Sequence, residues 1–142
     1  MTLNRLNPTE PTWSEFLSAL TDAGLPVDDL SDEGQFFFVS DAGVFGGFTL
    51  RGPHAMLRSL VAPTSVRGRG EGRRMVEALC NQAAENDASQ VWLLTTDAAD
   101  FFASCGFERA SRDDAPQILR TTRQFANLCP ASATLMHLTV VA

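Results

Sequence analysis

The stretch SVRGRGEGRRM, residues 65–75, brings together four arginines and three glycines in an otherwise acidic chain. Glycine lets consecutive backbone N–H groups turn toward one point, and arginine donates charge-assisted hydrogen bonds to oxyanions. If a helix begins at this position, the partial positive charge of its N-terminus adds to the attraction for phosphate oxygens. The stretch therefore predicts a phosphate-binding loop, with a glycine-rich turn and a solvated basic helix start as the simpler alternative.

The glycine spacing differs from that of two common nucleotide-binding loops. A Walker-type loop has Lys and then Ser or Thr after its last glycine, whereas here Arg73 and Arg74 follow Gly72. The GxGxxG fingerprint also fails, because Met75 stands where a fingerprint that begins at Gly70 needs its third glycine. The elements around the stretch must therefore decide its role.

Nucleophiles and metal ligands are sparse elsewhere. The chain has three cysteines and two histidines, none in CxxC or HxxxH spacing: Cys80, Cys105, Cys129, His54 and His137. This pattern predicts reduced thiols and no metal site. Cys129 lies in a loop without a nearby histidine, which favours a structural or substrate-lining role over a nucleophilic one. His54, in a turn, is a candidate base or simply solvated, and His137 is an ordinary strand residue.

Composition is that of an ordinary globular protein with an acidic surface. The 142 residues are 44% hydrophobic and 20% charged, which predicts a single domain over residues 1–142. Eleven Lys and Arg against 17 Asp and Glu give a net charge of −6, which argues against nucleic acid or an anionic membrane as a partner. No apolar run is long enough to span a bilayer, and no basic segment leads into an apolar signal sequence. Together with reduced thiols, this favours the cytoplasm.

Hydrophobic periodicity and turn residues indicate the elements that would position the loop. The first part of the chain predicts a strand, a helix with a capping box of Thr12 and Glu15 that ends at Gly24, and a short helical turn, at residues 2–6, 12–24 and 27–30. The middle predicts a hairpin of two strands around DAG and a third antiparallel strand, at residues 35–40, 44–50 and 56–62.

The rest of the chain alternates helical and strand patterns. Helices are predicted at residues 75–86, 97–105 and 114–128, the second of them capped by Asp97 and ended by Gly106. Strands are predicted at residues 90–96, 106–111 and 132–141, the first of them buried on both faces. This order of elements indicates a mixed α/β sheet with helices on both faces.

Together these features resemble the GNAT superfamily of acyl-CoA-dependent N-acyltransferases. The resemblance rests on Arg67-x-x-Gly70-x-Gly72 after SLVAP, followed by a strand and FFASCGF. More narrowly, LLTTDAADFFASCGF, FANLCPASA and MLRSL are similar to the small acetyltransferases encoded in arsenic-resistance operons. The resemblance covers nearly the whole chain in element order. It implies a mixed, mostly antiparallel sheet of six to seven strands, with acetyl-CoA as the cofactor.

The resemblance also implies which residues contact the cofactor. In the family the R-x-x-G-x-G loop holds the pyrophosphate of CoA, the preceding strand pairs with the pantetheine arm, and the helix before the Gly-Phe pair lies along that arm. A backbone N–H around Val61 and Ala62 would polarise the thioester carbonyl. The cofactor-binding positions carried over are Leu60, Val61, Ala62, Arg67, Gly68, Arg69, Gly70, Glu71, Gly72, Arg73, Thr96 and Phe102.

Two of these positions depart from the family. Glu71 stands where relatives have an apolar residue. If the Glu71 carboxylate faces the pyrophosphate, the two groups repel each other; if it points outward, it pairs with an arginine. Phe102 stands where many relatives have a tyrosine that protonates the leaving thiolate of CoA, and this chain has no tyrosine. Cys105, three residues on, is the candidate catalytic acid in its place, with a buried apolar role as the alternative.

Arg58 is the candidate substrate-binding residue on the predicted strand 56–62. Strand alternation places Met56, Arg58 and Leu60 on one face. An arginine within an apolar strand needs a partner, and two remain open: a buried Asp or Glu, or the carboxylate of an amino-acid-like substrate. Cys129 is the second candidate for the substrate side.

Two main hypotheses for function follow. The first is an acetyl-CoA-dependent N-acetyltransferase, monomeric or homodimeric, in which the amine of a small, amino-acid-like metabolite or toxin attacks directly in a ternary complex. The second is a catalytically weak or inactive domain that binds acyl-CoA as a sensor or structural partner, which the changes at Glu71 and Phe102 favour. A phosphate-binding α/β module unrelated to CoA would share only the loop.

Overall fold

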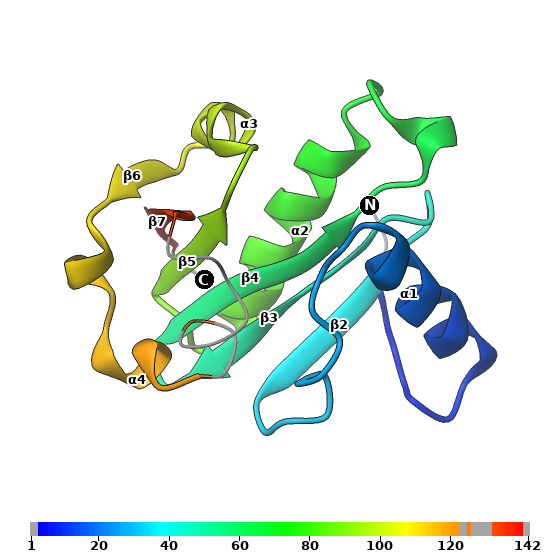
Figure 1. Cartoon of the computed structure of the whole chain (residues 1–142), viewed down its shortest axis with the longest axis horizontal. Helices are drawn as coiled ribbons and strands as arrows, with labels where there is room; N and C mark the ends of the chain where they lie inside the picture. Colours follow the sequence, from blue (N-terminus) through cyan, green and yellow to red (C-terminus); the bar gives the residue numbers. More distant parts are fainter. Residues whose placement is uncertain (1–2, 123–124, 126–131, 141–142) are drawn as a thin grey trace.

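The computed structural model describes residues 3–122, 125 and 132–140, which build one seven-stranded sheet covered by helices (Figure 1). The strands are β1 (Leu3–Arg5), β2 (Gln35–Ser40), β3 (Phe45–Arg51), β4 (His54–Val61), β5 (Gln90–Thr95), β6 (Glu108–Ala110) and β7 (Thr134–Thr139). The helices are α1 (Pro11–Asp22), α2 (Glu71–Glu85), α3 (Ala99–Ser104) and α4 (Gln117–Arg120). Two short 3-10 turns are at Thr64–Val66 and Arg112–Asp114.

The strand order in the sheet is β1-β2-β3-β4-β5-β7-β6. Neighbouring strands are antiparallel except for β4 and β5, which are parallel and are joined by the crossover through α2. This confirms the predicted mixed, mostly antiparallel sheet. The crossover places the glycine-rich loop at the carboxyl end of β4, which is where α/β proteins usually bind ligands.

Successive residues of the strands face opposite sides of the sheet and build two apolar layers. On one side Phe38 belongs to the same buried cluster as Leu79 of α2 and Phe102 of α3. On the other side the rings of Phe37 and Phe16 of α1 lie 5.1 Å apart. The predicted helices on both faces are therefore confirmed. No helix in the described ranges is long and apolar enough to cross a membrane.

Two of the predicted helix caps are wrong. Helix α1 begins at Pro11, one residue before Thr12, because proline lacks the N–H that the first helical position leaves unpaired and its fixed φ suits that position. Helix α3 has Ala98 as its N-cap in place of Asp97, and the Ala98 N–H donates to Thr95 Oγ1 at 3.0 Å. Each helix still starts next to its predicted position, so its apolar face is unchanged.

Two predicted helical segments are also shorter or absent. Residues 27–30 form no helical turn; a hydrogen bond of 3.0 Å from the Asp32 N–H to the Asp29 carbonyl closes a tighter turn there. This turn buries the Asp29 side chain. Helix α4 covers four residues of the predicted 114–128, of which residues 123–124 and 126–128 lie outside the described part.

Strand β4 contains a β-bulge that strand alternation did not predict. Two steps along β3, from Phe45 to Gly47, match three steps along β4, from Val61 to Arg58, so β4 has one residue more than its partner. The extra residue falls at Ser59, whose φ of +60° lies in the left-handed region. The strand therefore bends at Ser59.

The bulge reverses the alternation of side chains along β4. Before it, Leu57 packs in the α2 layer, while Arg58 lies over a ring on the α1 side. After it, Leu60 packs in the α2 layer and Val61 in the α1 layer. The prediction that Leu60 shares a face with Met56 and Arg58 is therefore wrong, because one inserted residue moves all later side chains to the opposite face.

Candidate functional site

The single parallel pair of strands opens into a cleft. Strands β4 and β5 pair only where residues 54–56 lie beside residues 90–92, near the start of both strands. Both continue, to Val61 and Thr95, and no further pair joins them in the described residues. The strands therefore diverge toward their carboxyl ends, and the edge of β4 that faces β5 keeps N–H and C=O groups that no neighbouring strand takes up.

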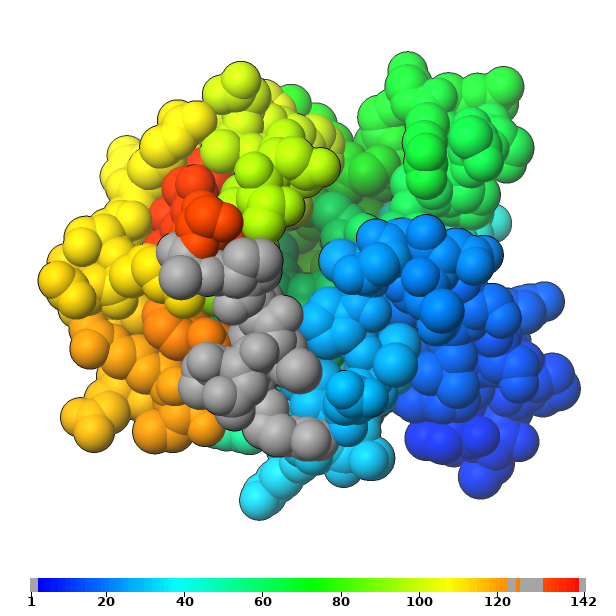
Figure 2. Space-filling view, viewed as in Figure 1, coloured from blue at the N-terminus to red at the C-terminus, as the bar shows by residue number. Residues whose placement is uncertain are grey.

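The cleft has a volume of about 210 Å³ and a mainly apolar lining from β4, β5, α2 and α3. In the space-filling view a hollow lies between α3, in yellow-green, and the green loop that precedes α2 (Figure 2). The apolar lining includes Leu57, Leu60, Leu79, Leu93, Phe101 and Phe102. The polar side chains that line it are those of Arg58, Ser59 and Thr95, and these decide what chemistry the cleft supports.

The glycine-rich loop lies at the mouth of this cleft. Gly68 and Gly70 have φ values of +80° and +77°, and Gly70 is the N-cap of α2. A Cβ atom at Gly72 would lie 3.5 Å from the ring of Phe101, in the cleft wall. One at Gly68 or Gly70 would have no described residue within 4 Å apart from its chain neighbours. The loop thus packs against the cleft on one side and leaves the backbone at its two left-handed glycines open.

The first N–H groups of α2 have no acceptor among the described residues. No side chain caps the helix, and the first backbone bond runs from the Arg74 N–H to the Gly70 carbonyl at 3.1 Å. The N–H groups of residues 71–73 therefore project from the end of a 15-residue helix, where the macrodipole adds positive charge. Open glycines and unsatisfied donors together fit an oxyanion such as a phosphate group.

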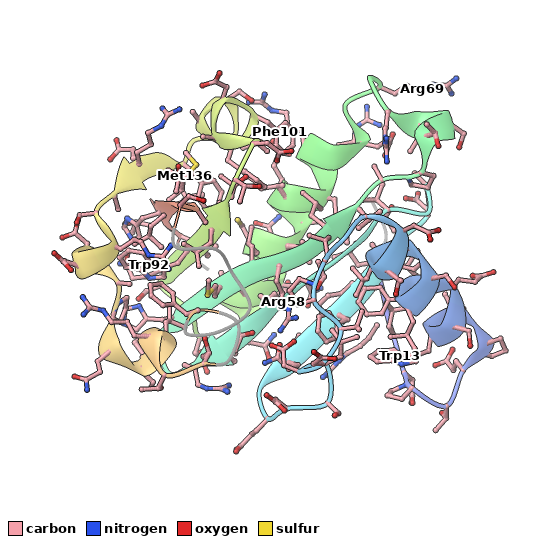
Figure 3. All side chains as sticks on the ribbon, viewed as in Figure 1. Trp13, Arg58, Arg69, Trp92, Phe101 and Met136 are labelled. Atoms are coloured by element: carbon pink, nitrogen blue, oxygen red, sulfur yellow. The ribbon has the colours of Figure 1, made fainter. Side chains whose placement is uncertain are left out.

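The arginines of the loop divide into two kinds. Arg67 Nε donates to the Ala62 carbonyl at 3.1 Å, and Arg73 donates to the Ser104 carbonyl at the end of α3. These bonds tie the loop to both sides of the cleft. The Arg69 side chain has no hydrogen bond or ion pair within the described part of the chain and extends from the tip of the loop (Figure 3). Arg69 is therefore the side chain of the loop that is free to meet an anion.

Glu71 points along α2 rather than into the loop. Its Oε1 lies 2.7 Å from Nη1 of Arg74, three residues on, and its side chain is 16% exposed. This arrangement corresponds to the outward alternative that the sequence left open. Because Arg74 neutralises the carboxylate, Glu71 repels an anion at the loop far less than an unpaired carboxylate would.

Phe102 and Thr96 occupy different environments. Phe102 is buried in the cleft wall, and its ring meets those of Phe101 and Phe107 edge to face at 5.0 and 6.0 Å. It therefore supplies an apolar wall and no proton donor. Thr96 is exposed after the end of β5 and is absent from the cleft lining, where Thr95 stands instead.

The structure does not bring Cys105 into the cleft. Cys105 is the C-cap of α3 and lines a separate hollow with Cys80 of α2 and Leu138 of β7. Burial is the main cause that raises the pKa of the Cys105 thiol, and the nearby Arg73 charge opposes it. The spacing of three residues from Phe102 predicted a shared helix face, but α3 ends before Cys105, so the thiol does not follow that face.

Arg58 forms a buried ion pair with Asp29. Two bonds, Nη1 to Oδ2 at 2.5 Å and Nη2 to Oδ1 at 2.6 Å, join the groups, and both side chains are 2% exposed. Gln35 Oε1 accepts a further bond from Nη1 at 3.1 Å. The pair attaches the segment between α1 and β2 to the bulged part of β4, where Arg58 is labelled in Figure 3. Of the two partners that the sequence left open for Arg58, the structure contains the buried carboxylate.

The histidines lie where β4 and β5 remain paired, away from the cleft. Trp92 Nε1 donates to His54 Nδ1 at 3.2 Å, and the rings of Trp92 and His137 are 4.3 Å apart. Burial is the main cause that lowers the pKa of both histidines. Cys129 lies outside the described residues, which contain no group of three or more His, Cys, Asp or Glu that could hold a metal ion.

Comparison with known sequences gives one family. The family described as acetyltransferase (GNAT) domain matches residues 32–109, just over half of the chain. The matched region includes the glycine-rich loop and both strands of the cleft. No curated protein sequence matches the chain.

Solved structures share this fold at low sequence identity. Rv2747 from Mycobacterium tuberculosis, in complex with CoA and NLQ, has a TM-score of 0.78 and 16% identity, covering 99% of this chain and 100% of that one. An aminoglycoside 6'-N-acetyltransferase complexed with coenzyme A has a TM-score of 0.72 and 16% identity, covering 100% and 98%.

The N-acetylglutamate synthase of Neisseria gonorrhoeae is a longer protein that contains the same fold. Its complex with coenzyme A and N-acetyl-glutamate has a TM-score of 0.76 and 14% identity, and covers 100% of this chain. This chain spans only 36% of the synthase chain. At these identities the likeness concerns the fold alone.

Proposed function

The chain belongs to the acetyltransferase (GNAT) domain family, and on this premise we propose that it is an acetyl-CoA-dependent N-acetyltransferase. In this proposal the amine of a small, amino-acid-like metabolite or toxin attacks directly in a ternary complex. The observation that carries the proposal is the open glycine loop, with its unsatisfied helix donors, beside the unpaired edge of β4. The N-acetyl-glutamate bound to the Neisseria synthase supports an amino-acid-like acceptor. The kinship with arsenic-resistance acetyltransferases, the single domain and the cytoplasmic location stay predictions.

The residues around the cleft fit acetyl-CoA, which would supply an acetyl group activated as a thioester. The N–H groups of residues 71–73 and the Arg69 side chain would hold the pyrophosphate, and Gly68 and Gly70 leave room for its close approach. The backbone edge of residues 60–62, at the end of β4 and just beyond it, would hydrogen-bond the amides of the pantetheine arm, as a neighbouring strand would. Phe102 would pack along the other side of the arm.

The described cleft contributes positioning more than proton transfer. Its lining contains no histidine and no acidic side chain, and the Asp29 carboxylate behind it is already paired with Arg58. Holding an amine and a thioester in contact removes much of the entropic barrier to their reaction. A leaving thiolate with a pKa near that of cysteine, about 8.5, is stable enough to depart without a strong acid. Such a site therefore supports acetyl transfer without a tyrosine at position 102.

One observation favours a second candidate function, a catalytically weak or inactive domain that binds acyl-CoA. Phe102 offers no hydroxyl and Cys105 lies outside the cleft, so the usual acid of the family has no substitute at either position. Calorimetry with acetyl-CoA, followed by thiol release with a library of amines, separates the two. Binding with amine-dependent thiol release supports the enzyme; binding without release for any amine supports the sensor; absence of binding contradicts both.

Replacing Glu71 by leucine is expected to tighten acetyl-CoA binding about two- to fivefold at low ionic strength, because Arg74 loses its partner and adds positive charge beside the pyrophosphate. Replacing Glu71 by leucine and Arg74 by methionine together should restore the affinity to within about twofold of the unmodified protein. Calorimetry at two salt concentrations measures both variants. Equal tightening in the single and double variants would show that the Glu71 carboxylate itself opposes the phosphates.

Phe102→Tyr is expected to raise kcat by less than about tenfold, and Cys105→Ala to lower it by less than about tenfold. The first effect is small because the thiolate of CoA departs readily even without a phenol to protonate it. The second is small because the Cys105 thiol lies outside the cleft. Steady-state kinetics with a responsive amine measures both. A loss of several hundredfold in a folded Cys105→Ala protein that still binds acetyl-CoA would place Cys105 in the chemistry after all.

A further inference from the structure

Ser59 is held in an unusual backbone conformation inside the cleft. Among the described residues it is one of two non-glycine residues with a positive φ, the other being Asp87 at +71°. It is the extra residue of the β4 bulge, it lines the cleft, and it is only 8% exposed. Residues in sparsely populated conformations persist where the surrounding structure imposes them, and they gather at functional sites. The strained backbone at Ser59 therefore points to a functional role for its side chain.

The hydroxyl of Ser59 has a hydrogen to donate, and no group among the described residues receives it. Arg58 Nε donates to Ser59 Oγ at 3.3 Å. A guanidinium has donors only, so the serine hydrogen cannot point back at Arg58. No other group in the described ranges bonds to this hydroxyl. A buried donor without a partner is costly and uncommon in proteins, so a ligand in the cleft is the natural acceptor.

The ion pair behind Ser59 strengthens it as a donor. The Arg58 guanidinium donates two hydrogen bonds to the Asp29 carboxylate, which fixes its Nε beside the serine oxygen. A charged donor that bonds to the hydroxyl oxygen draws electron density from it and makes its hydrogen more positive. The pair therefore orients the hydroxyl and polarises it toward the cleft.

We propose that Ser59 is a catalytic residue whose hydroxyl donates a hydrogen bond to the thioester carbonyl oxygen of bound acetyl-CoA, with Arg58 as the positioning residue. This rests on the proposed function. An arm that enters at the glycine loop and follows the edge of β4 from residue 62 toward residue 60 reaches Ser59 where the strands converge. The donor then lies at the deep end of the arm, where an acetyl group would be.

The hydroxyl acts without giving up its proton. The amine nitrogen forms the new C–N bond with its lone pair, the C–S bond breaks with its electron pair on sulfur, and the proton lost by the amine passes to water. Negative charge develops on the carbonyl oxygen while the amine attacks and disappears as the C–S bond breaks. A fixed donor at that oxygen stabilises the transition state more than the bound thioester.

The test compares Ser59→Gly with two matched variants. Ser59→Gly removes the hydroxyl and relieves the positive φ, Asp87→Gly relieves the same backbone strain away from the cleft, and Ser59→Asn restores a donor on a residue that tolerates a positive φ. Isotope-edited infrared spectra of acetyl-CoA with a ¹³C carbonyl report the hydrogen bond directly. Calorimetry with CoA and acetyl-CoA and steady-state kinetics complete the set.

We expect the carbonyl band of bound acetyl-CoA to lie at lower frequency in the unmodified protein and in Asp87→Gly, and to lose most of this shift in Ser59→Gly. The preference for acetyl-CoA over CoA should fall with it, and kcat should fall about 10- to 100-fold while CoA affinity stays within about twofold. Ser59→Asn should regain part of the band shift.

Three outcomes would overturn the proposal. An unchanged carbonyl band and kcat in Ser59→Gly would remove the role of Ser59 and leave the proposed function intact. Equal losses of CoA and acetyl-CoA affinity would make Ser59 structural. Failure of the unmodified protein to bind acetyl-CoA would end the proposed function and this inference with it. If acetyl-CoA binds but no amine is acetylated, the acetyltransferase proposal fails. The infrared band then still shows whether the Ser59 hydroxyl donates to the thioester carbonyl.

Discussion

Gly70→Val is expected to lower the affinity for acetyl-CoA at least tenfold, about 1.4 kcal/mol. Gly70 is the N-cap of α2 with a φ of +77°, and an added Cβ would point into open space, with no atom of the described residues beyond its chain neighbours within 4 Å. A valine side chain would fill the space through which the pyrophosphate would approach the N–H groups of residues 71–73. Calorimetric titration with acetyl-CoA and with CoA measures the loss.

Gly52→Val is the matched control for the backbone strain at Gly70. Gly52 also has a positive φ, +58°, and an added Cβ would meet nothing within 4 Å, but it lies in the turn between β3 and β4, at the opposite end of β4 from the loop. Both variants should lose comparable stability, because a β-branched residue is strained at a positive φ. Only Gly70→Val should lose affinity. An unchanged affinity in folded Gly70→Val, or an equal loss in Gly52→Val, would contradict the role of the loop.

Asp29→Asn is expected to lower the free energy of unfolding by about 3 kcal/mol or more, because it leaves the buried Arg58 charge without its counter-ion. Denaturant unfolding measures the loss. Asp100→Asn is the matched control: Asp100 pairs with Arg109 at 3.2 Å, but its side chain is fully exposed, so the same substitution should change stability little. A change in Asp29→Asn as small as that in Asp100→Asn would contradict the buried pair.

A double variant separates the ion pair from a role in binding substrate. Replacing Asp29 by leucine and Arg58 by methionine removes both charges, and it should recover much of the stability that Asp29→Asn loses. If the acceptor carboxylate displaced Asp29 and bound Arg58, the double variant would raise the KM for an amino-acid-like acceptor and leave CoA affinity unchanged. An unchanged KM would confine Arg58 to positioning Ser59 and the segment between α1 and β2.

The fold and the loop were predictable because their signals are local. Alternation and turn residues located the strands, and the recurrence of Met75, Val76, Leu79 and Cys80 located the buried face of α2. The loop was predictable because few roles other than a turn or an oxyanion site need alternating glycine and arginine. Each of these features depends on residues close together in the sequence, so propensity and periodicity are sufficient to find them.

The rest of the site depends on pairings between distant residues. Asp29 is one of four acidic residues in PVDDLSDEG, and nothing local distinguishes the one that reaches Arg58. The bulge at Ser59 arises from the register between β3 and β4, and no glycine marks the left-handed residue. Cys105 was misplaced because helical spacing was extended one residue beyond the end of α3. Tertiary context decides such features, and a single sequence does not contain it in readable form.

The unpaired edge of β4 has a consequence for how this protein can evolve. Hydrogen bonds to a strand edge and to a helix start come from the main chain, and every residue type except proline provides both groups. A binding surface of this kind survives the replacement of most of its side chains. Selection on cofactor binding would therefore constrain backbone shape at the loop and at β4 while leaving residue identity largely free. Distant members could then keep one cofactor while their remaining side chains diverge toward different acceptors.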